Sequence, residues 1–101
     1  MPTHLRHVVL LAFKATASRQ DVQQIEEIFV QLEHQIGEVA ALEWGLNVSP
    51  ENLAQGFTHC FVLTFETAAD RDTYLTHPDH LAFSKRLEPH LENVCVIDYW
   101  P

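Results

Sequence analysis

Apolar and polar residues alternate in four segments of this chain. Residues 5–13 place an apolar or histidine side chain at every second position, and residues 42–48, 57–65 and 94–100 repeat this period. A period of two is typical of a β-strand. The middle parts of residues 5–13 and 57–65 are apolar on both faces, so we expect both sides of the sheet to be covered there.

A longer period predicts a helix between the first two strands. Ser18, followed three residues later by Asp21, is a helix start related to the capping box. Apolar residues then recur at steps of three and four until Gly37, where the helix is expected to end. These apolar residues are Val22, Ile25, Phe29, Leu32 and Ile36.

The second helical region is predicted to consist of two helices. Thr67, with an aspartate three residues later, repeats the start signal, and the first helix ends near Leu75. His77 precedes Pro78, which disfavours helical geometry at His77 and allows a new helix to begin at the proline. Pro89 bends or ends that helix.

The predicted order of elements is therefore β-α-β-β-α-β. This order is typical of the ferredoxin-like fold, an α+β fold with helices on one face of a four-stranded antiparallel sheet. Residues 1–101 are expected to form one domain. The other face of the sheet also carries apolar residues, among them Val8, Leu10, Cys60 and Val62. We therefore predict a homodimer in which two sheets pack face to face.

The charge and the apolar runs exclude two classes of partner. Acidic residues number 14 against 6 basic ones, for a net charge of -8, and no run of Lys or Arg occurs. We predict no nucleic-acid partner, because a phosphate backbone would be repelled. The longest apolar run near the N-terminus, residues 8–13, is too short for a signal peptide or a membrane span. We expect no membrane association and a cytoplasmic location, where Cys60 and Cys95 are buried thiols rather than a disulfide.

Two residues near the helix break have the chemistry of an acid–base pair. His80 shares a helical face with Phe83 and Leu87, and a neutral imidazole there is a candidate general base. The phenol of Tyr74 can polarise a carbonyl and stabilise an enolate. In the alternative interpretation, His80 is a hydrogen-bonded core histidine and Tyr74 is an amphipathic side chain at the rim of the core.

Two more histidines lie on the same strand faces as the apolar core residues. If the first and third strands are neighbours, we expect His7 and His59 to approach each other and the region of Tyr74 and His80. Alternatively, one or both imidazoles lie at strand ends and face solvent.

The histidines also raise the question of a metal. His77, Asp79 and His80, together with His7 and His59, would provide enough ligands for zinc or iron. The proline break does not hold the first two imidazoles on one helical face, and no third ligand is tied to them by spacing. We therefore predict no metal site and no cofactor, and keep zinc, iron and haem as less favoured alternatives.

Several short segments resemble one known family. The most specific is Tyr74-Leu75-x-His77-Pro78-x-His80-x-x-Phe83. The others are His7-Val8-Val9-Leu10 with Phe13-Lys14, Trp44-Gly45, Asn47-Val48-Ser49, Gly56-Phe57-Thr58-His59, Thr64-Phe65-Glu66 and Asp98-Tyr99. Together they resemble the stress-responsive dimeric α/β-barrel (Dabb) family over almost the whole chain. The resemblance implies the same fold, assembled as a dimeric α+β barrel.

The resemblance also implies candidate site residues. Most Dabb proteins are known as stress-associated or uncharacterised, but one plant branch contains a polyketide cyclase. In that branch, a Tyr and a His at the positions of Tyr74 and His80 perform acid–base chemistry. The chain departs from the branch at Glu26, where the cyclase has an aromatic residue. The positions that line the pocket in the cyclase correspond here to His7, Val9, Leu11, Ile25, Phe29, Phe61 and His77.

Two functions remain open from the sequence. The first is a small stress-responsive homodimer that binds a small molecule between sheet and helices without catalysis. The second is an enolisation enzyme without an organic cofactor, acting on a β-dicarbonyl or polyketide-like substrate, with His80 as base and Tyr74 as oxyanion donor.

Overall fold

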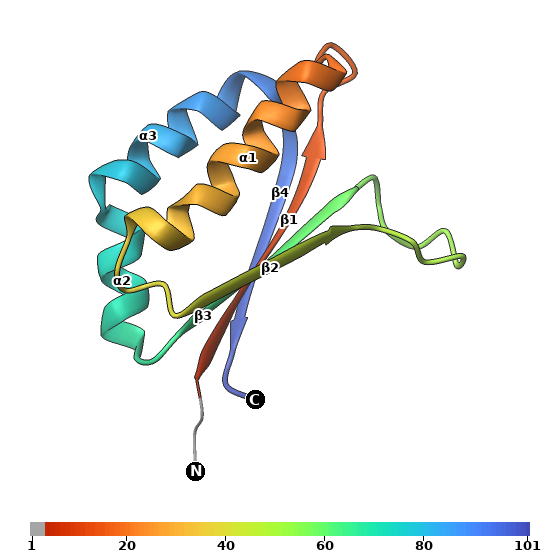
Figure 1. Ribbon diagram of the computed structural model, residues 1–101. Coiled ribbons are helices and arrows are strands. Elements are labelled where there is room, and N and C mark those ends of the chain that lie inside the picture. The colour runs from red at the N-terminus through yellow and green to blue at the C-terminus, as the bar shows by residue number, and fades with distance from the viewer. Residues whose placement is uncertain (1–3) are drawn as a thin grey trace.

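The computed structural model describes residues 4–101, which form a four-stranded antiparallel sheet with all the helices on one face (Figure 1). The strand order in the sheet is β2-β3-β1-β4. The elements are β1 (Leu5–Phe13), α1 (Arg19–Gln35), β2 (Ala41–Leu46), β3 (His59–Phe65), α2 (Ala68–Thr76), α3 (Pro78–Leu87), the 3₁₀ turn η1 (Glu88–His90) and β4 (Leu91–Tyr99). The predicted α+β ferredoxin-like fold is confirmed.

The helix starts use the predicted caps. The Ser18 hydroxyl accepts a hydrogen bond from the Asp21 backbone N–H at 3.0 Å, and the Asp21 carboxylate accepts one from the Ser18 N–H at 3.0 Å. This reciprocal pair satisfies two backbone donors that the first turn of a helix leaves unpaired. Thr67 caps α2 in a similar way by accepting from the Asp70 N–H at 3.0 Å.

Three strand boundaries differ from the periodicity. β3 begins at His59 rather than at residue 57, because Gly56 has a φ of 86° and the Phe57 N–H bonds to the Ala54 carbonyl in a turn. β2 ends at Leu46 rather than at residue 48. β4 begins at Leu91 rather than at residue 94, because pairing with the end of β1 extends it. Main-chain hydrogen bonding sets the ends of these strands, and the alternation of apolar and polar side chains does not reveal it.

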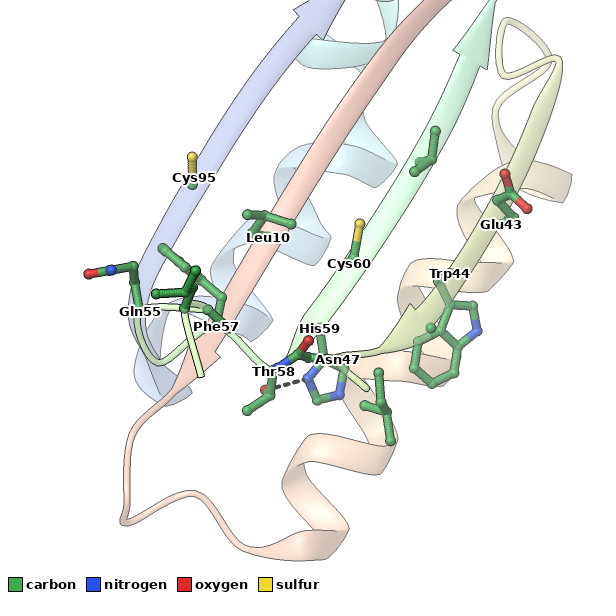
Figure 2. Close-up of a pocket in the computed structure, with 15 residues that line it drawn as sticks. Leu10, Glu43, Trp44, Asn47, Gln55, Phe57, Thr58, His59, Cys60 and Cys95 are labelled. Atoms are coloured by element: carbon green, nitrogen blue, oxygen red, sulfur yellow. Dashed lines mark hydrogen bonds between the residues drawn. The ribbon is translucent and has the colours of Figure 1, made fainter. Parts of the chain in front are cut away.

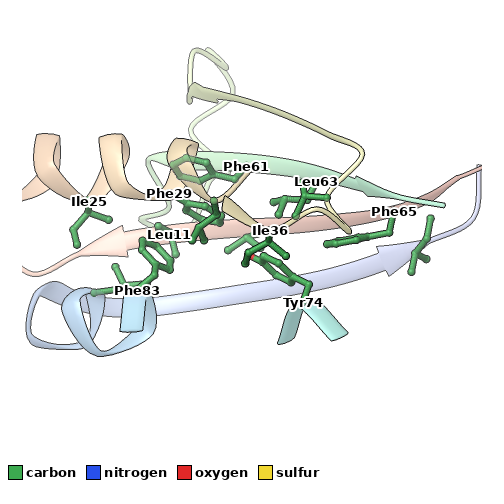
Figure 3. Packing of buried hydrophobic residues seen from close by; sticks show 14 residues of the cluster. Leu11, Ile25, Phe29, Ile36, Phe61, Leu63, Phe65, Tyr74 and Phe83 are labelled. Atoms are coloured by element: carbon green, nitrogen blue, oxygen red, sulfur yellow. The ribbon is translucent and has the colours of Figure 1, made fainter. Parts of the chain in front are cut away.

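The core lies between the sheet and the helices, and aromatic rings form its centre (Figure 3). The ring of Phe29 on α1 stacks on Phe61 of β3 with centroids 4.0 Å apart, and it meets Phe83 of α3 at 4.7 Å. Stacked and tilted ring pairs at this spacing stabilise a core beyond the burial of their area. Helices α1 and α3 are therefore held to the sheet through one aromatic cluster.

The opposite face of the sheet is apolar and is not covered by any element of residues 4–101 (Figure 1). The strand register places Val8 beside Val62 and Ile97, and Leu10 beside Cys60 and Cys95. We call these six residues the open sheet face. Ile97 is 58% exposed, whereas the two cysteines are free thiols and half-buried rather than buried as predicted.

No helix within residues 4–101 combines the length and the apolar character needed to cross a membrane.

Candidate functional site

A cavity of about 600 Å³ lies between the inner face of the sheet and helices α2 and α3. Strands β1 and β4 form its floor, and Tyr74, His80 and Phe83 form part of its helical wall. Its complete lining is His7, Val9, Leu11, Phe29, Arg71, Asp72, Tyr74, Leu75, His80, Phe83, Ser84, Leu87, Glu88, Leu91, Val94, Val96 and Asp98. An apolar cavity with a few polar groups is the usual form of a small-molecule site.

Tyr74 and His80 converge at this cavity, although they belong to different helices. Their ring centroids lie 4.5 Å apart. The break between α2 and α3 at His77 brings the two rings together. His77 caps the end of α2 and the start of α3, and its Nδ1 accepts a hydrogen bond from the Asp79 N–H at 3.1 Å. The proline that follows makes this cap conformation favourable.

His80 has the state required of a base. Its Nδ1 lies 3.0 Å from the Leu75 carbonyl oxygen, which can only accept, so Nδ1 carries the proton and donates. The lone pair of the neutral ring is then on Nε2. Burial lowers the pKa of His80 below its ordinary value, and the neighbouring His7 lowers it further, against the hydrogen bond to Leu75. The imidazole is therefore neutral at pH 7.

Tyr74 has the state required of a hydrogen-bond donor. Its side chain is 1% exposed, and burial raises its pKa well above the ordinary value of 10.0. Tyr74 is one of the residues that line the cavity. Because its raised pKa keeps the hydroxyl protonated, the phenol is a candidate donor to a bound oxygen.

A second imidazole completes the polar side of the cavity. The ring of His7 is 4% exposed and lies edge-on to Tyr74 at 5.9 Å. Its Nδ1 donates to the Asp98 carboxylate at 2.7 Å, and the other Asp98 oxygen accepts from Arg71 Nη1 at 2.8 Å. A carboxylate partner of this kind orients an imidazole and selects its tautomer.

Sequence reasoning did not assign a role to Arg71 or to Asp98. Asp98 appeared only within a family motif, and Arg71 appeared in no motif. The register of β1 and β4 pairs His7 with Asp98 directly, so a correct strand alignment is the signal that would have found this contact. Arg71 reaches the pair from α2, which no strand pattern predicts.

The structure brings together part of the predicted set of site residues. His7, Val9, Leu11 and Phe29 line the cavity with Tyr74 and His80. The other three predicted residues lie elsewhere: Ile25 and Phe61 are buried in the core, and His77 is the helix cap described above. Contact of a ligand with Ile25, Phe61 and His77 stays a prediction. The roles predicted for the six residues that line the cavity also stay predictions.

The expected approach of His59 to His7 is wrong. β1 and β3 are neighbours as predicted, but the register pairs His7 with Leu63 and His59 with Leu11. Four residues of strand, roughly 13 Å, therefore separate the two histidines along the sheet. His59 is buried, and its Nε2 lies 2.6 Å from the Glu26 carboxylate of α1.

A second cavity, of about 610 Å³, opens on the other side of the sheet, near the loop that joins β2 to β3 (Figure 2). Its walls include Leu10, Cys60 and Cys95 of the open sheet face, together with Trp44. The only imidazole in its lining is His59, which uses both nitrogens, one with Glu26 and one with the Thr58 hydroxyl at 2.7 Å. Among the described residues, the second cavity therefore offers no free imidazole, and its carboxylate is that of Glu43.

Potential metal ligands remain dispersed in the described part of the chain. Nowhere in residues 4–101 do three or more His, Cys, Asp or Glu side chains gather as a metal ion would require. His77 uses its Nδ1 as a helix cap and His80 uses its Nδ1 on a carbonyl. The absence of a metal or cofactor stays a prediction.

Comparison with known proteins places this chain in a family. The profile of Dabb, described as the stress responsive A/B barrel domain, matches residues 5–101. The chain belongs to the Dabb family. It is 37% identical over 97 residues to the stress-response A/B barrel domain-containing protein HS1 of Arabidopsis thaliana, a match that covers 96% of this chain and 89% of that protein. The predicted family is therefore confirmed.

Two other similar proteins carry enzyme names, and a third is similar in fold. Olivetolic acid cyclase of Cannabis sativa is 27% identical over 97 residues, which is 96% of each chain. The structure of hydroxynitrile lyase from Passiflora edulis superposes with a TM-score of 0.93 at 30% identity, covering 100% of this chain and 95% of that one. A Thermobifida fusca protein, described as dimeric and ferredoxin-like, shares the fold at 20% identity with a TM-score of 0.82, covering 100% and 93%.

Proposed function

We propose that the cavity between sheet and helices is the active site of an acid–base enzyme. It would act on a small carbonyl compound by moving a proton at the carbon next to the carbonyl. The observation that carries this proposal is the convergence of a neutral His80 and a protonated Tyr74, 4.5 Å apart, on one cavity. The names of the cyclase and the hydroxynitrile lyase are compatible with acid–base chemistry beside an oxygen-bearing carbon.

Each residue would have one role in the proposed reaction. His80 Nε2 takes the proton from the α-carbon, and the electrons of the C–H bond form the C=C bond of an enolate. The negative oxygen accepts a hydrogen bond from the Tyr74 hydroxyl, and this interaction is stronger in the enolate than in the ketone. Returning a proton from His80 to carbon completes the cycle. His7, held by Asp98, orients the substrate oxygen or the Tyr74 hydroxyl.

A direct test uses exchange of α-protons with solvent. The purified protein is incubated with 1-phenylpropan-2-one in D₂O, and loss of the CH₂ signal is followed by NMR. We expect exchange faster than in buffer alone, because base and donor act together on one C–H bond. Exchange at the buffer rate, for this ketone and for a β-diketone, would contradict the proposed activity.

A non-catalytic ligand-binding protein is the second candidate. The family description, stress responsive, names no reaction, and the wall of the cavity is mostly apolar. Saturable ligand shifts in the NMR spectrum without any α-proton exchange would favour this candidate over the enzyme.

We also propose that the chain forms a homodimer through the open sheet face. Apolar residues on three adjacent strands support this proposal, because a surface of this kind favours association. Similar structures from Bacteroides fragilis and Thermobifida fusca are described as dimeric. Packing of two such faces would produce the barrel that the family description names.

The Ile97→Glu variant tests the dimer. The new carboxylate would lie on the open sheet face, on the edge strand β4 beside Val8, and would be buried against apolar residues in the proposed dimer. We therefore expect the variant to sediment as a monomer where the wild-type protein sediments as a dimer. Leu81→Glu is the matched control, since Leu81 is similarly exposed, at 50%, but lies on α3 on the helical side. A dimer that persists in Ile97→Glu, or dissociates in Leu81→Glu, would exclude this interface.

A further inference from the structure

We propose that the cavity selects uncharged substrates and rejects carboxylate or phosphate-bearing ones. This inference rests on the proposed function, and it concerns the class of compound rather than the reaction. It follows from the charged side chains of the cavity wall and from the bonds that those side chains already make.

Carboxylates outnumber cations in the wall. Asp72, Glu88 and Asp98 line the cavity, and within residues 4–101 Arg71 is the only Lys or Arg in the lining. Lys85 and Arg86 belong to α3 but are exposed and do not line the cavity. With the imidazole of His80 neutral, an anionic substrate would meet more like charges than opposite ones.

Arg71 is not free to receive a substrate anion. Its Nε donates to the Asp72 carboxylate at 2.9 Å, and its Nη1 donates to the Asp98 carboxylate at 2.8 Å. Recognition of a carboxylate by arginine generally uses two parallel N–H donors. Here, one donor on each side of the guanidinium is already occupied, and breaking the Asp98 contact would also disturb the partner of His7.

A cationic substrate is disfavoured for a different reason. The inner part of the cavity is apolar, built from side chains such as Leu11, Phe29 and Val96. Both Asp98 oxygens are used, one by His7 and one by Arg71, so no free carboxylate oxygen of Asp98 remains to replace the water of a cation. The other two wall carboxylates, Asp72 and Glu88, are exposed to solvent, so a cation beside them would remain in contact with water rather than enter the apolar part of the cavity. Burying an unpaired charge in such a place is costly. An uncharged molecule with one carbonyl oxygen, which Tyr74 can bind, fits these conditions.

Three ketones that differ only in charge test the proposal. They are 1-phenylpropan-2-one, its ring 4-carboxylate, and its ring 4-trimethylammonium derivative. We expect kcat/KM for α-proton exchange to be at least about tenfold higher for the neutral ketone than for the carboxylate at low salt. Added salt should narrow this gap, since it screens the repulsion. Equal or better use of either charged ketone would overturn the proposal.

Binding provides a readout that does not depend on catalysis. Dissociation constants for the three ketones, from NMR titration, should rank in the same order. If none of the ketones exchanges faster than in buffer but the neutral one binds most tightly, the proposed activity fails and the selectivity stands. If none binds, or if a charged ketone binds most tightly, the selectivity fails.

A charge variant locates the cause. Glu88→Gln removes one wall carboxylate with little change in shape, so we expect it to improve use of the ring carboxylate several-fold relative to the neutral ketone. Glu92→Gln is the matched control, because Glu92 is exposed on β4 and does not line the cavity. If both variants improved use of the ring carboxylate equally, the cause would be the overall charge of the protein. That result would contradict the role proposed for the carboxylates of the cavity wall.

Discussion

The His80→Ala variant is expected to lose about 10²- to 10⁴-fold in α-proton exchange, the range typical of a missing general base. The neutral His80 imidazole has its lone pair on Nε2 and a lowered pKa, and its ring centroid lies 4.5 Å from that of Tyr74. Tyr74→Phe should also lower the rate, because the enolate oxygen would lose its donor. Initial exchange rates from NMR measure both effects. All variants are compared at one protein concentration, above the dissociation constant of the proposed dimer.

Two variants separate chemistry from structure in this test. His80→Asn keeps a side-chain N–H that can donate to the Leu75 carbonyl but has no base, so it should be as inactive as His80→Ala. His34→Ala removes an exposed histidine at the end of α1 and should leave the rate unchanged. Activity in His80→Asn comparable to wild type would show that His80 is not the base.

The pH dependence of the wild-type rate is a second readout of the same group. A base must be neutral, so the rate falls only as pH drops through the pKa of His80, which lies below the ordinary value of 6.5. On the alkaline side, the raised pKa of Tyr74 keeps its phenol protonated beyond pH 10. The exchange rate should therefore fall as the pH drops below 6.5, and ionisation of Tyr74 should not lower the rate up to pH 10.

The Phe61→Ala variant is expected to lower the free energy of unfolding by about 3–5 kcal/mol, as for other buried Phe-to-Ala changes. Its side chain is 0% exposed, and its ring stacks on Phe29 at 4.0 Å and on Trp44 at 5.2 Å. Removing the ring leaves a void between α1 and β3. The void cannot close, because backbone hydrogen bonds to the strands on both sides hold β3 in place. Urea unfolding measures the loss, at a fixed protein concentration because the proposed dimer would add to stability.

The same experiment distinguishes a core residue from a ligand contact at this position. Leu53→Ala, at an exposed site in the loop after β2, is the control and should change stability by less than about 0.5 kcal/mol. Phe61→Leu, which retains most of the volume, should keep the exchange rate and KM of wild type. A large rise in KM with stability intact would instead place Phe61 in the ligand site, as the family resemblance implied.

Much of the fold was predictable because local rules and the hydrophobic pattern agree. The Ser18 and Thr67 caps, the helix break at Pro78 and the face of α1 that carries Phe29 all follow from neighbours in sequence. Strand ends were predicted less well, since pairing with a distant strand sets them, as the extension of β4 to Leu91 shows.

The candidate site was predictable only in part. Tyr74 and His80 lie six residues apart, so local geometry around one proline brings them together. The strand periodicity put both His7 and His59 with the core residues, but their distance depends on the register of β1 and β3, which separates them. Arg71 and Asp98 lie 27 residues apart in the chain and meet only because the fold brings the Arg71 side chain of α2 within reach of β4.

The sequence by itself determined the order of elements, the helix caps, the apolar open sheet face and the placing of Tyr74 and His80 on either side of the break at Pro78. Each depends on residue type and short-range spacing. Only the tertiary structure decided that His7 is held by Asp98, that Glu26 engages His59 and that one arginine is shared between two carboxylates. These contacts join segments distant in sequence, and their geometry depends on strand register and helix packing, which no local pattern encodes.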